Sequence, residues 1–165
     1  SPDATAENPT VARGWQCALT VPRELSMRGG KLCQWPAHEI ERMRGDCVRA
    51  VGGETVEEPG RLFDVVVSCE GAKMVELEIR KGVFVRYADG MLTLDMGDEG
   101  YGRDRRSIEL GELRDLRVLS DTTMVEIFAN GGEAALTSRT YSPAVPAMGL
   151  HAEGAASMDF YRLAH

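Results

Sequence analysis

The sequence predicts an all-β protein that folds as an antiparallel two-sheet β-sandwich, preceded by a hairpin and one short helix. Two observations support this fold class. From Asp46 onward, apolar residues alternate with polar ones at a period of two, which is the pattern of strands with one buried face. Turn signals such as Asp89-Gly90 separate these runs about every 8–12 residues, a spacing typical of sandwiches and barrels.

The N-terminal part of the chain differs in character from the rest. Residues 1–14 are polar and lack periodicity, so we expect a linker there. A short strand is predicted over 15–21, where Pro22 would end it because proline cannot donate to a strand ladder. A second strand is predicted over 31–35, after a turn at Gly29-Gly30.

A short helix is predicted over 36–44. Pro36 suits the first position of a helix, and two apolar residues three apart fall on one face among charged neighbours. The helix is expected at a boundary between two units, one over 1–44 and the sandwich over 45–165.

The strands of the sandwich follow from the alternation and the turns between runs. We predict strands over 63–69, 75–80, 83–87, 92–96, around 118, 125–129, 134–141, 149–153 and 157–163. The inward positions of these strands form the predicted core, which consists of Val65, Val67, Leu77, Ile79, Val85, Leu94, Val125, Ile127 and Leu136.

Composition excludes several classes of partner. The net charge is −7 and the pI is about 5.0, so the phosphate backbone of nucleic acid would be repelled. No apolar run approaches the roughly 18 residues of a membrane helix, so no membrane partner is expected. The four cysteines lack the spacing of a zinc or redox site, and we expect reduced thiols in a cytoplasmic protein, with one disulfide in an exported protein as the alternative.

No catalytic, cofactor-binding or metal-binding residue is assigned from the sequence. Glu76 and Glu78 share one strand face and are interpreted as solvent-exposed, as is Glu126, which alternates with apolar neighbours. The densest acidic cluster stands beside arginines and matches no regular calcium loop, so local charge compensation is expected. This cluster is Asp95, Asp98, Glu99 and Asp104, with Arg103, Arg105 and Arg106 beside it.

The remaining chemistry-bearing residues also favour structural roles. His38, His151 and His165 are far apart in sequence, and none sits in a ligand-spaced pair. Most of the aromatic residues that a sugar-binding surface could use lie in alternating strands, where packing is expected, while Tyr101 lies in a glycine-rich loop. The aromatic candidates are Trp15, Trp35, Tyr87, Tyr101, Tyr141 and Tyr161.

Two segments resemble signatures of glycoside hydrolase family 32, the invertase or β-fructofuranosidase family. The segment 19–25, which reads LTVPREL after Trp15, resembles the family's L-T-L-P-R-E-L run. The segment 125–139 contains VEIFAN, then Gly-Glu and LTSR, and resembles the family's V-E-V-F-x-N-x-G-E…L-T-S-R run. Between them, Leu32, Gln34, Pro36, Glu39 and Arg44 fit the family's inter-domain stretch.

The resemblance implies a position within a larger enzyme. Members of this family pair an N-terminal five-bladed propeller, which carries the active site, with a C-terminal sandwich resembling a lectin-like jelly roll. The family's Asn-Asp-Pro, Arg-Asp-Pro and Glu-Cys catalytic motifs do not occur in this sequence. By this resemblance, 1–44 is the end of the propeller plus a linker helix, and 45–165 is the sandwich.

The expected function is therefore that of a non-catalytic module of a retaining fructoside hydrolase. It would buttress the propeller, its expected partner, and could form homodimer contacts. A free-standing carbohydrate-binding sandwich is the alternative, and a catalytic sandwich of the lectin-fold glycanase type is a third reading. The sequence leaves open whether the parent enzyme acts on sucrose, sucrose 6-phosphate or a fructan. The chain by itself is predicted to be inactive.

Overall fold

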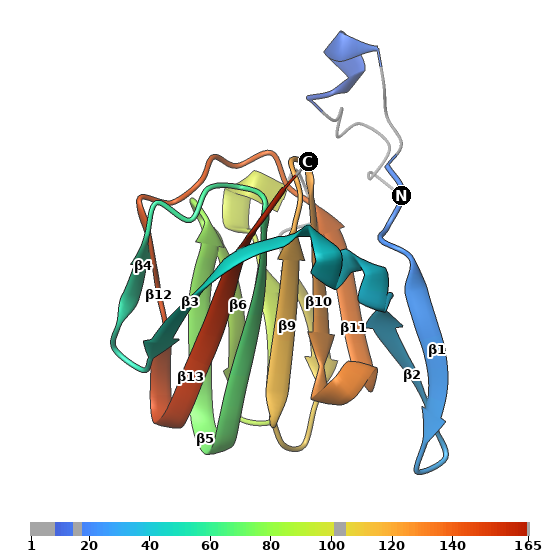
Figure 1. Cartoon of the computed structure of the whole chain (residues 1–165), viewed down its shortest axis with the longest axis vertical. Coiled ribbons are helices and arrows are strands. Elements are labelled where there is room, and N and C mark those ends of the chain that lie inside the picture. Colours follow the sequence, from blue (N-terminus) through green and yellow to red (C-terminus); the bar gives the residue numbers. More distant parts are fainter. Residues whose placement is uncertain (1–8, 15–17, 101–104, 165) are drawn as a thin grey trace.

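The fold is an antiparallel sandwich with a hairpin packed against one side (Figure 1). It is known from a computed structural model that describes residues 9–14, 18–100 and 105–164. The described N-terminal elements are η2 (Val11–Arg13), β1 (Arg23–Arg28), β2 (Lys31–Pro36) and the 3-10 helix η3 (His38–Met43). Within these ranges no helix is long and apolar enough to span a membrane.

The sandwich contains the remaining elements. They are β3 (Arg44–Val51), β4 (Thr55–Glu57), β5 (Phe63–Arg80), β6 (Val83–Ala88), β7 (Met91–Asp95), η4 (Gly97–Gly100), β8 (Arg105–Glu109), β9 (Asp115–Ser120), β10 (Met124–Ala129), η5 (Asn130–Gly132), β11 (Ala134–Arg139), β12 (Ala147–Gly149) and β13 (His151–Leu163). All the strand pairs are antiparallel, which confirms the fold class predicted from the alternation.

Two long strands join the layers of the sandwich. The first part of β5 pairs with β9, and its second part pairs with β6. The strand β13 runs along β5 and pairs with β3 on its other side. The sequence analysis predicted two strands in place of each long one, 63–69 and 75–80 for β5, and 149–153 and 157–163 for β13, with Gly71 and Gly154 in the gaps between them. Instead both glycines lie at the register shift where β5 and β13 cross between layers, and a Cβ on Gly154 would lie 2.9 Å from Ala72.

The core fills the space between the layers as predicted. Eight of the nine predicted core side chains are buried, and Leu136 is partly buried and packs against the same cluster. Burial of these side chains provides the main driving force for folding. Strands β3, β4 and β8 were not predicted, because their residues are mostly exposed and carry little alternation.

Arg80 is buried in the sandwich, and no carboxylate among the described residues forms an ion pair with it. Its guanidinium donates to the Ser120 hydroxyl at 2.8 Å. It also donates to three backbone carbonyls, those of Ser142 at 3.0 Å, Arg61 at 3.1 Å, and Asp121. Burial, together with the charge of Arg61, lowers the pKa of Arg80 to about 10. These bonds fix the loops around the end of β5.

The hairpin differs from its prediction. Residues 15–17 lie outside the described part, and 18–22 form no strand, so the predicted strand is absent from 18–21 and the first described strand is β1. The turn at Gly29-Gly30 sets the register, because Arg28 pairs with Lys31 and pairing runs back from there to Arg23. The predicted helix over 36–44 is the shorter 3-10 helix η3. So short a segment forms too few hydrogen bonds to offset the free-energy cost of nucleating an α-helix.

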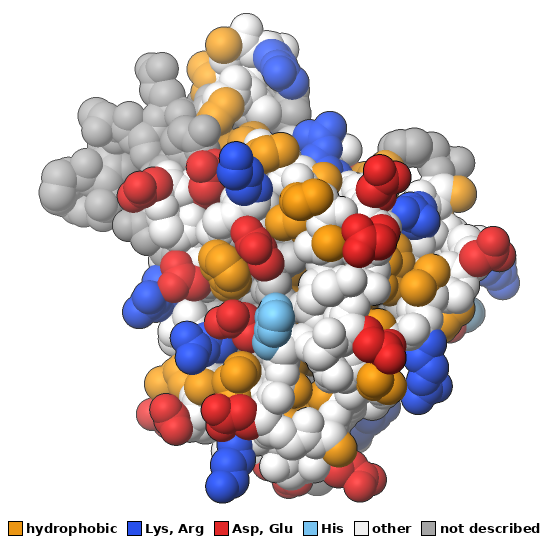
Figure 2. All heavy atoms as spheres, turned by 90° about the vertical axis from the view of Figure 1, so that its left-hand side faces the viewer, with side chains coloured by type: hydrophobic (Ala, Val, Ile, Leu, Met, Phe, Trp, Pro, Cys, Tyr) orange, Lys and Arg blue, Asp and Glu red, His pale blue; other side chains and the backbone are white. Residues whose placement is uncertain are grey.

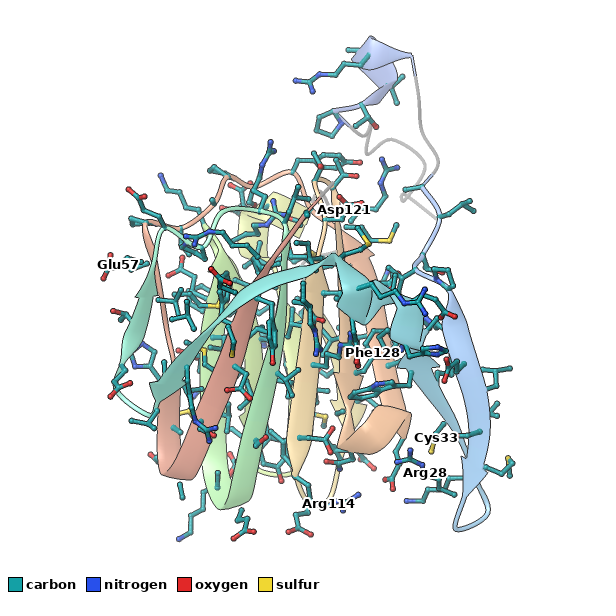
Figure 3. The ribbon with its side chains drawn as sticks, in the orientation of Figure 1. Arg28, Cys33, Glu57, Arg114, Asp121 and Phe128 are labelled. Atoms are coloured by element: carbon teal, nitrogen blue, oxygen red, sulfur yellow. The ribbon has the colours of Figure 1, made fainter. Side chains whose placement is uncertain are left out.

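The hairpin and η3 cover the outer face of the sheet at β9 and β10. All six residues of β10 are buried, and five of six in β9, so these strands are buried on both faces. Phe128 of β10 lies on the hairpin side of the sandwich (Figure 3). Its ring centroid is 6.1 Å from that of Trp35 of β2. Residues 18–44 therefore add a third layer over this part of the sandwich.

Candidate functional site

Arg23, the first residue of β1, ties the hairpin to the sandwich. Its guanidinium donates to Gln34 Oε1 and to Thr137 Oγ1, both at 2.8 Å, and lies 5.0 Å from the centre of the Phe128 ring. Its Nη2 is 3.6 Å from Glu126 Oε2, an ion pair too long for a hydrogen bond. One side chain thus links β1, β2, β10 and β11.

Glu126 is the buried acid of this region. It is 2% exposed, and its Oε1 accepts the backbone N–H of Val21 at 3.0 Å. Its other oxygen, Oε2, is buried without a hydrogen-bond partner. Burial raises the pKa of Glu126, and the Val21 N–H and the charge of Arg23 oppose this only in part. The expectation that Glu126 faces solvent is wrong, because residues from the hairpin side cover its face of β10.

A second buried charge group joins η3 to the sheet. Asp64 is fully buried and accepts from Arg117 Nε and Nη2 at 3.0 and 2.8 Å and from Arg44 Nε at 2.7 Å. Arg117 Nη1 lies 3.7 Å from Glu41 Oε1 of η3, and its guanidinium is 5.3 Å from the centre of the Trp35 ring. No sequence pattern indicated this cluster, because Asp64 is 20 residues from Arg44 and 53 residues from Arg117.

A cavity of about 240 Å³ opens where residues 18–22, which precede β1, meet η3, β10 and the end of β13. We call it the Glu126 cavity. Its walls are mostly apolar, and Glu126 and Asp121 also line it. None of the described residues that line it carries a positive charge. The apolar walls include Leu19, Val21, Ile40, Met43 and Leu163.

Large apolar side chains are exposed on the same side of the molecule. Leu25 and Met27 of β1 are both 66% exposed, and Leu32, opposite Met27 on β2, is 55% exposed. We call these three residues the hairpin face. Leu19, which precedes the hairpin, is 96% exposed. On the side away from the hairpin, acidic and basic side chains are interspersed among scattered apolar ones (Figure 2). The hairpin side is thus the best candidate for a docking surface.

Four of the acidic candidates from the sequence lie elsewhere and have structural partners; among them, Glu99 Oε2 accepts from the Ser142 hydroxyl at 3.1 Å. Glu76 pairs with Arg86 at 3.6 Å, and Glu78 accepts the Gly82 N–H at 3.1 Å. In the acidic cluster Asp95 pairs with Arg105 at 2.7 Å, and this bond lowers the pKa of Asp95. Charge compensation is therefore confirmed for Asp95, whereas Arg103 and Asp104 lie outside the described residues.

The structure brings His38 between two glutamates, a grouping that sequence spacing did not indicate. His38 Nδ1 is 2.7 Å from Glu24 Oε1, and Nε2 is 3.4 Å from Glu39 Oε1. The bond to Glu24 raises the pKa of His38 and lowers that of Glu24. All three side chains are exposed, and both ring nitrogens already face carboxylates. The group is a surface ion pair between β1 and η3. His151 is exposed, and His165 lies outside the described residues.

The aromatic and cysteine candidates mostly serve packing. Tyr87 is buried, and its hydroxyl donates to the Gly111 carbonyl at 3.0 Å. The ring of Tyr161 packs against Arg44, whose guanidinium is 4.3 Å from the ring centre. Trp15, Tyr101 and Cys17 lie outside the described residues. The described cysteines, Cys33, Cys47 and Cys69, are free thiols.

Comparison with known proteins gives a consistent result. Residues 77–163 match the family described as glycosyl hydrolases family 32 C terminal. The chain is 36% identical to raffinose invertase of Escherichia coli over 82% of its length, and 32% identical to sucrose-6-phosphate hydrolase of Salmonella typhimurium over the same share. It spans only 32% and 28% of these two relatives.

Solved structures share the fold. Sucrose-6-phosphate hydrolase from Lactobacillus gasseri aligns over 96% of this chain and 36% of its own, with a TM-score of 0.80 and 18% identity. The exo-inulinase of Aspergillus awamori aligns over 91% of this chain and 36% of its own, with a TM-score of 0.73 and 19% identity. In each case the sandwich corresponds to about a third of a larger protein.

Proposed function

The chain belongs to glycosyl hydrolases family 32, in its C-terminal region, and from this membership we propose that it is the non-catalytic sandwich of a β-fructofuranosidase. The curated relatives are about three times as long as the part that matches. In this proposal residues 45–165 form the sandwich, and 1–44 join it to an N-terminal domain that carries the active site. The sandwich buttresses that domain.

The observation that carries the proposal is the hairpin face. Leu25, Met27 and Leu32 are exposed together on one hairpin, and Leu19 is exposed on the segment that leads into it. Exposed apolar clusters of this kind mark protein contacts more often than single exposed residues do. Because the linker enters on this side, the N-terminal domain is the natural partner for the face.

The chemistry of the parent enzyme also belongs to the proposal. The two relatives are named raffinose invertase and sucrose-6-phosphate hydrolase. From these names we propose that the larger enzyme to which this chain belongs hydrolyses a β-fructoside. A retaining glycosidase needs two carboxyl groups about 5 Å apart across the scissile bond. Of the acids singled out in the sequence, Glu76 and Asp95 pair with arginines and Glu78 accepts a backbone N–H, which supports a sandwich without catalytic residues of its own.

A binding experiment tests this proposal. The polypeptide encoded upstream of this chain is produced separately and mixed with the chain, and association is measured by size-exclusion chromatography with light scattering. Replacing Leu25, Met27 and Leu32 by serine should abolish association. The matched control replaces Val48 and Val51 of β3, which are 41% and 47% exposed but lie outside the hairpin. Equal loss in both variants, or association only between copies of this chain, would count against the proposal.

A further inference from the structure

A groove of about 470 Å³ lies between the hairpin and the outer face of the sandwich. Its volume falls within the roughly 300–1,000 Å³ that is typical of small-molecule sites. We call it the Trp35 groove. Its apolar surface comes mainly from an indole ring and a valine, and polar side chains of both signs surround them. The residues that line it include Ser26, Arg28, Trp35, Val66, Asp115 and Gly131.

Arg28 of β1 supplies a guanidinium to this groove. Figure 3 shows its side chain between the hairpin and the sandwich. A Cβ on Gly131 would lie 2.5 Å from Arg28 Nη1, so the guanidinium lies against η5. The side chain is exposed, and its guanidinium forms no ion pair or hydrogen bond with another described residue. Its N–H donors are therefore available to a ligand.

Asp115 of β9 supplies a carboxylate to the same groove. Its Oδ1 accepts the backbone N–H of Gly131 at 2.9 Å, so the carboxylate also lies beside η5. Within the described part of the chain, Asp115 and Arg28 are not joined by an ion pair, although both lie close to Gly131. The groove thus presents a group that only donates hydrogen bonds and a group that only accepts them.

This arrangement favours a ligand whose neighbouring groups both donate and accept. Adjacent hydroxyls of a sugar do so, because each hydroxyl has one O–H donor and two acceptor lone pairs. One hydroxyl can donate to Asp115 while its neighbour accepts from Arg28, and the C–H groups of the sugar can pack on Trp35 and Val66. Glu24 also lines the groove, so two acids stand against one arginine there, which disfavours an anionic ligand.

We propose that the Trp35 groove binds an uncharged sugar unit, which Arg28 and Asp115 hold by hydrogen bonds and Trp35 contacts through its ring. The site goes beyond the proposed function, because it lies in this chain and not in the N-terminal domain. Arg28 and Met27 are neighbours on β1 and so point to opposite faces of the hairpin. Docking at the hairpin face therefore uses the other side of β1, and Leu25 alone belongs to both surfaces.

The first test measures sugar binding by this chain without a partner. The ¹⁵N-labelled chain is titrated at pH 7 with sucrose, which offers a furanose and a pyranose ring, and separately with sucrose 6-phosphate. Sucrose should cause saturable NMR shifts at the Trp35 indole N–H and at the amides of Ser26, Arg28 and Gly131. Sucrose 6-phosphate should bind no more tightly than sucrose. Absence of saturable shifts at these positions, or tighter binding of the phosphorylated sugar, would overturn the proposal.

Three variants place the sugar in the groove. Arg28→Met keeps an apolar stem but removes the donors, and should weaken sucrose binding about tenfold. Ser26→Trp adds a bulky ring at an exposed position that lines the groove, and should abolish binding. Arg86→Met is the matched control, because it removes an exposed arginine that pairs with Glu76 outside the groove, and it should bind sucrose as the unsubstituted chain does. Equal loss in Arg28→Met and Arg86→Met, or full binding by Ser26→Trp, contradicts the proposed site.

The second test separates this inference from the proposed function. Arg28→Met is mixed with the N-terminal polypeptide, and the dissociation constant should equal that of the unsubstituted chain, since the hairpin face is unchanged. If the chain associates with the polypeptide but does not bind sucrose, the sugar site is wrong and the proposed function stands. If sucrose binds in the groove but no association occurs, the proposed function fails and the sugar site stands.

Discussion

Replacing Asp64 by Asn should destabilise the sandwich and release η3. Asp64 is fully buried and accepts three hydrogen bonds from Arg44 and Arg117 at 2.7–3.0 Å. Asn has the same shape, but it removes the negative charge and turns an N–H group toward the guanidinium ions. Arg117, whose side chain is 1% exposed, would keep a buried charge, and among the described residues its remaining ion-pair partner would be Glu41 of η3, at 3.7 Å.

The magnitude follows from the burial of the pair. Removing one partner of a buried ion pair costs about 3–5 kcal/mol. Glu41 is 48% exposed and can offset roughly 1 kcal/mol at most, so the lower end, about 3 kcal/mol, is expected. For a chain of this size each kcal/mol lowers the melting temperature by about 2–4 °C, so the drop should be roughly 6–12 °C.

Calorimetry and urea unfolding measure the loss of stability. Trp35 fluorescence reports changes near the substituted residue, because the Trp35 ring packs on Arg117. Asp159→Asn is the matched control, since its pair with Arg49 is 3.9 Å long and its side chain is 38% exposed. The control should change stability by less than about 0.5 kcal/mol. Replacing Asp64 and Arg117 together by leucine should cost less than the two single changes combined, because neither member of the Asp64–Arg117 pair is then left as an unpaired buried charge. A melting temperature of Asp64→Asn equal to that of Asp159→Asn would refute the reasoning.

Three further predictions follow from the same packing. Gly132→Ala would place a Cβ 2.0 Å from the Gln34 carbonyl oxygen, so amide hydrogen exchange in β1 and β2 should accelerate. Gly53→Ala is the control, because a Cβ there meets open space and should leave the hairpin protected from exchange. Ile127→Asp buries an unpaired charge in the core and should unfold the domain by circular dichroism; an unchanged melting temperature would remove Ile127 from the core. Glu126 has a raised pKa when folded, so its protonated form stabilises the protein below the unfolded-state pKa, and this contribution is lost as pH rises. The unfolding free energy of the unsubstituted chain, relative to that of Glu126→Gln, should therefore fall as pH rises above the unfolded-state pKa of Glu126. A rise would show that the pairing of Glu126 with Arg23 outweighs its burial.

The sandwich could be predicted because its strands have one buried face. Val75, Leu77 and Ile79 alternate with charged residues, and the structure buries the three apolar side chains in the core. The turn at Asp89-Gly90 likewise marked the hairpin of β6 and β7. Local alternation and turn chemistry are sequence properties, so they identified these elements without tertiary information.

The outer layer could not be predicted, since it depends on contacts between distant segments. Glu126 looked solvent-exposed in an alternating strand, yet the N–H that it binds belongs to Val21, 105 residues earlier. A signal was present, because Met124 and Phe128, which share the face of Glu126, are apolar. A strand with apolar residues on both faces is buried on both. The same lesson applies to Arg80, whose partners are loop carbonyls that no pattern reveals.

The most direct test of the central claim is fructose release from sucrose by three samples. These are the chain alone, the N-terminal polypeptide alone, and the two combined at equal concentrations, each before and after mild heating. We predict no release by the chain alone, and activity of the N-terminal polypeptide that survives heating better when the chain is present. Release by the chain alone, lost on replacement of one of its own carboxylates, would contradict the claim of a non-catalytic supporting sandwich, as would an N-terminal polypeptide whose activity and heat stability are unaffected by the chain.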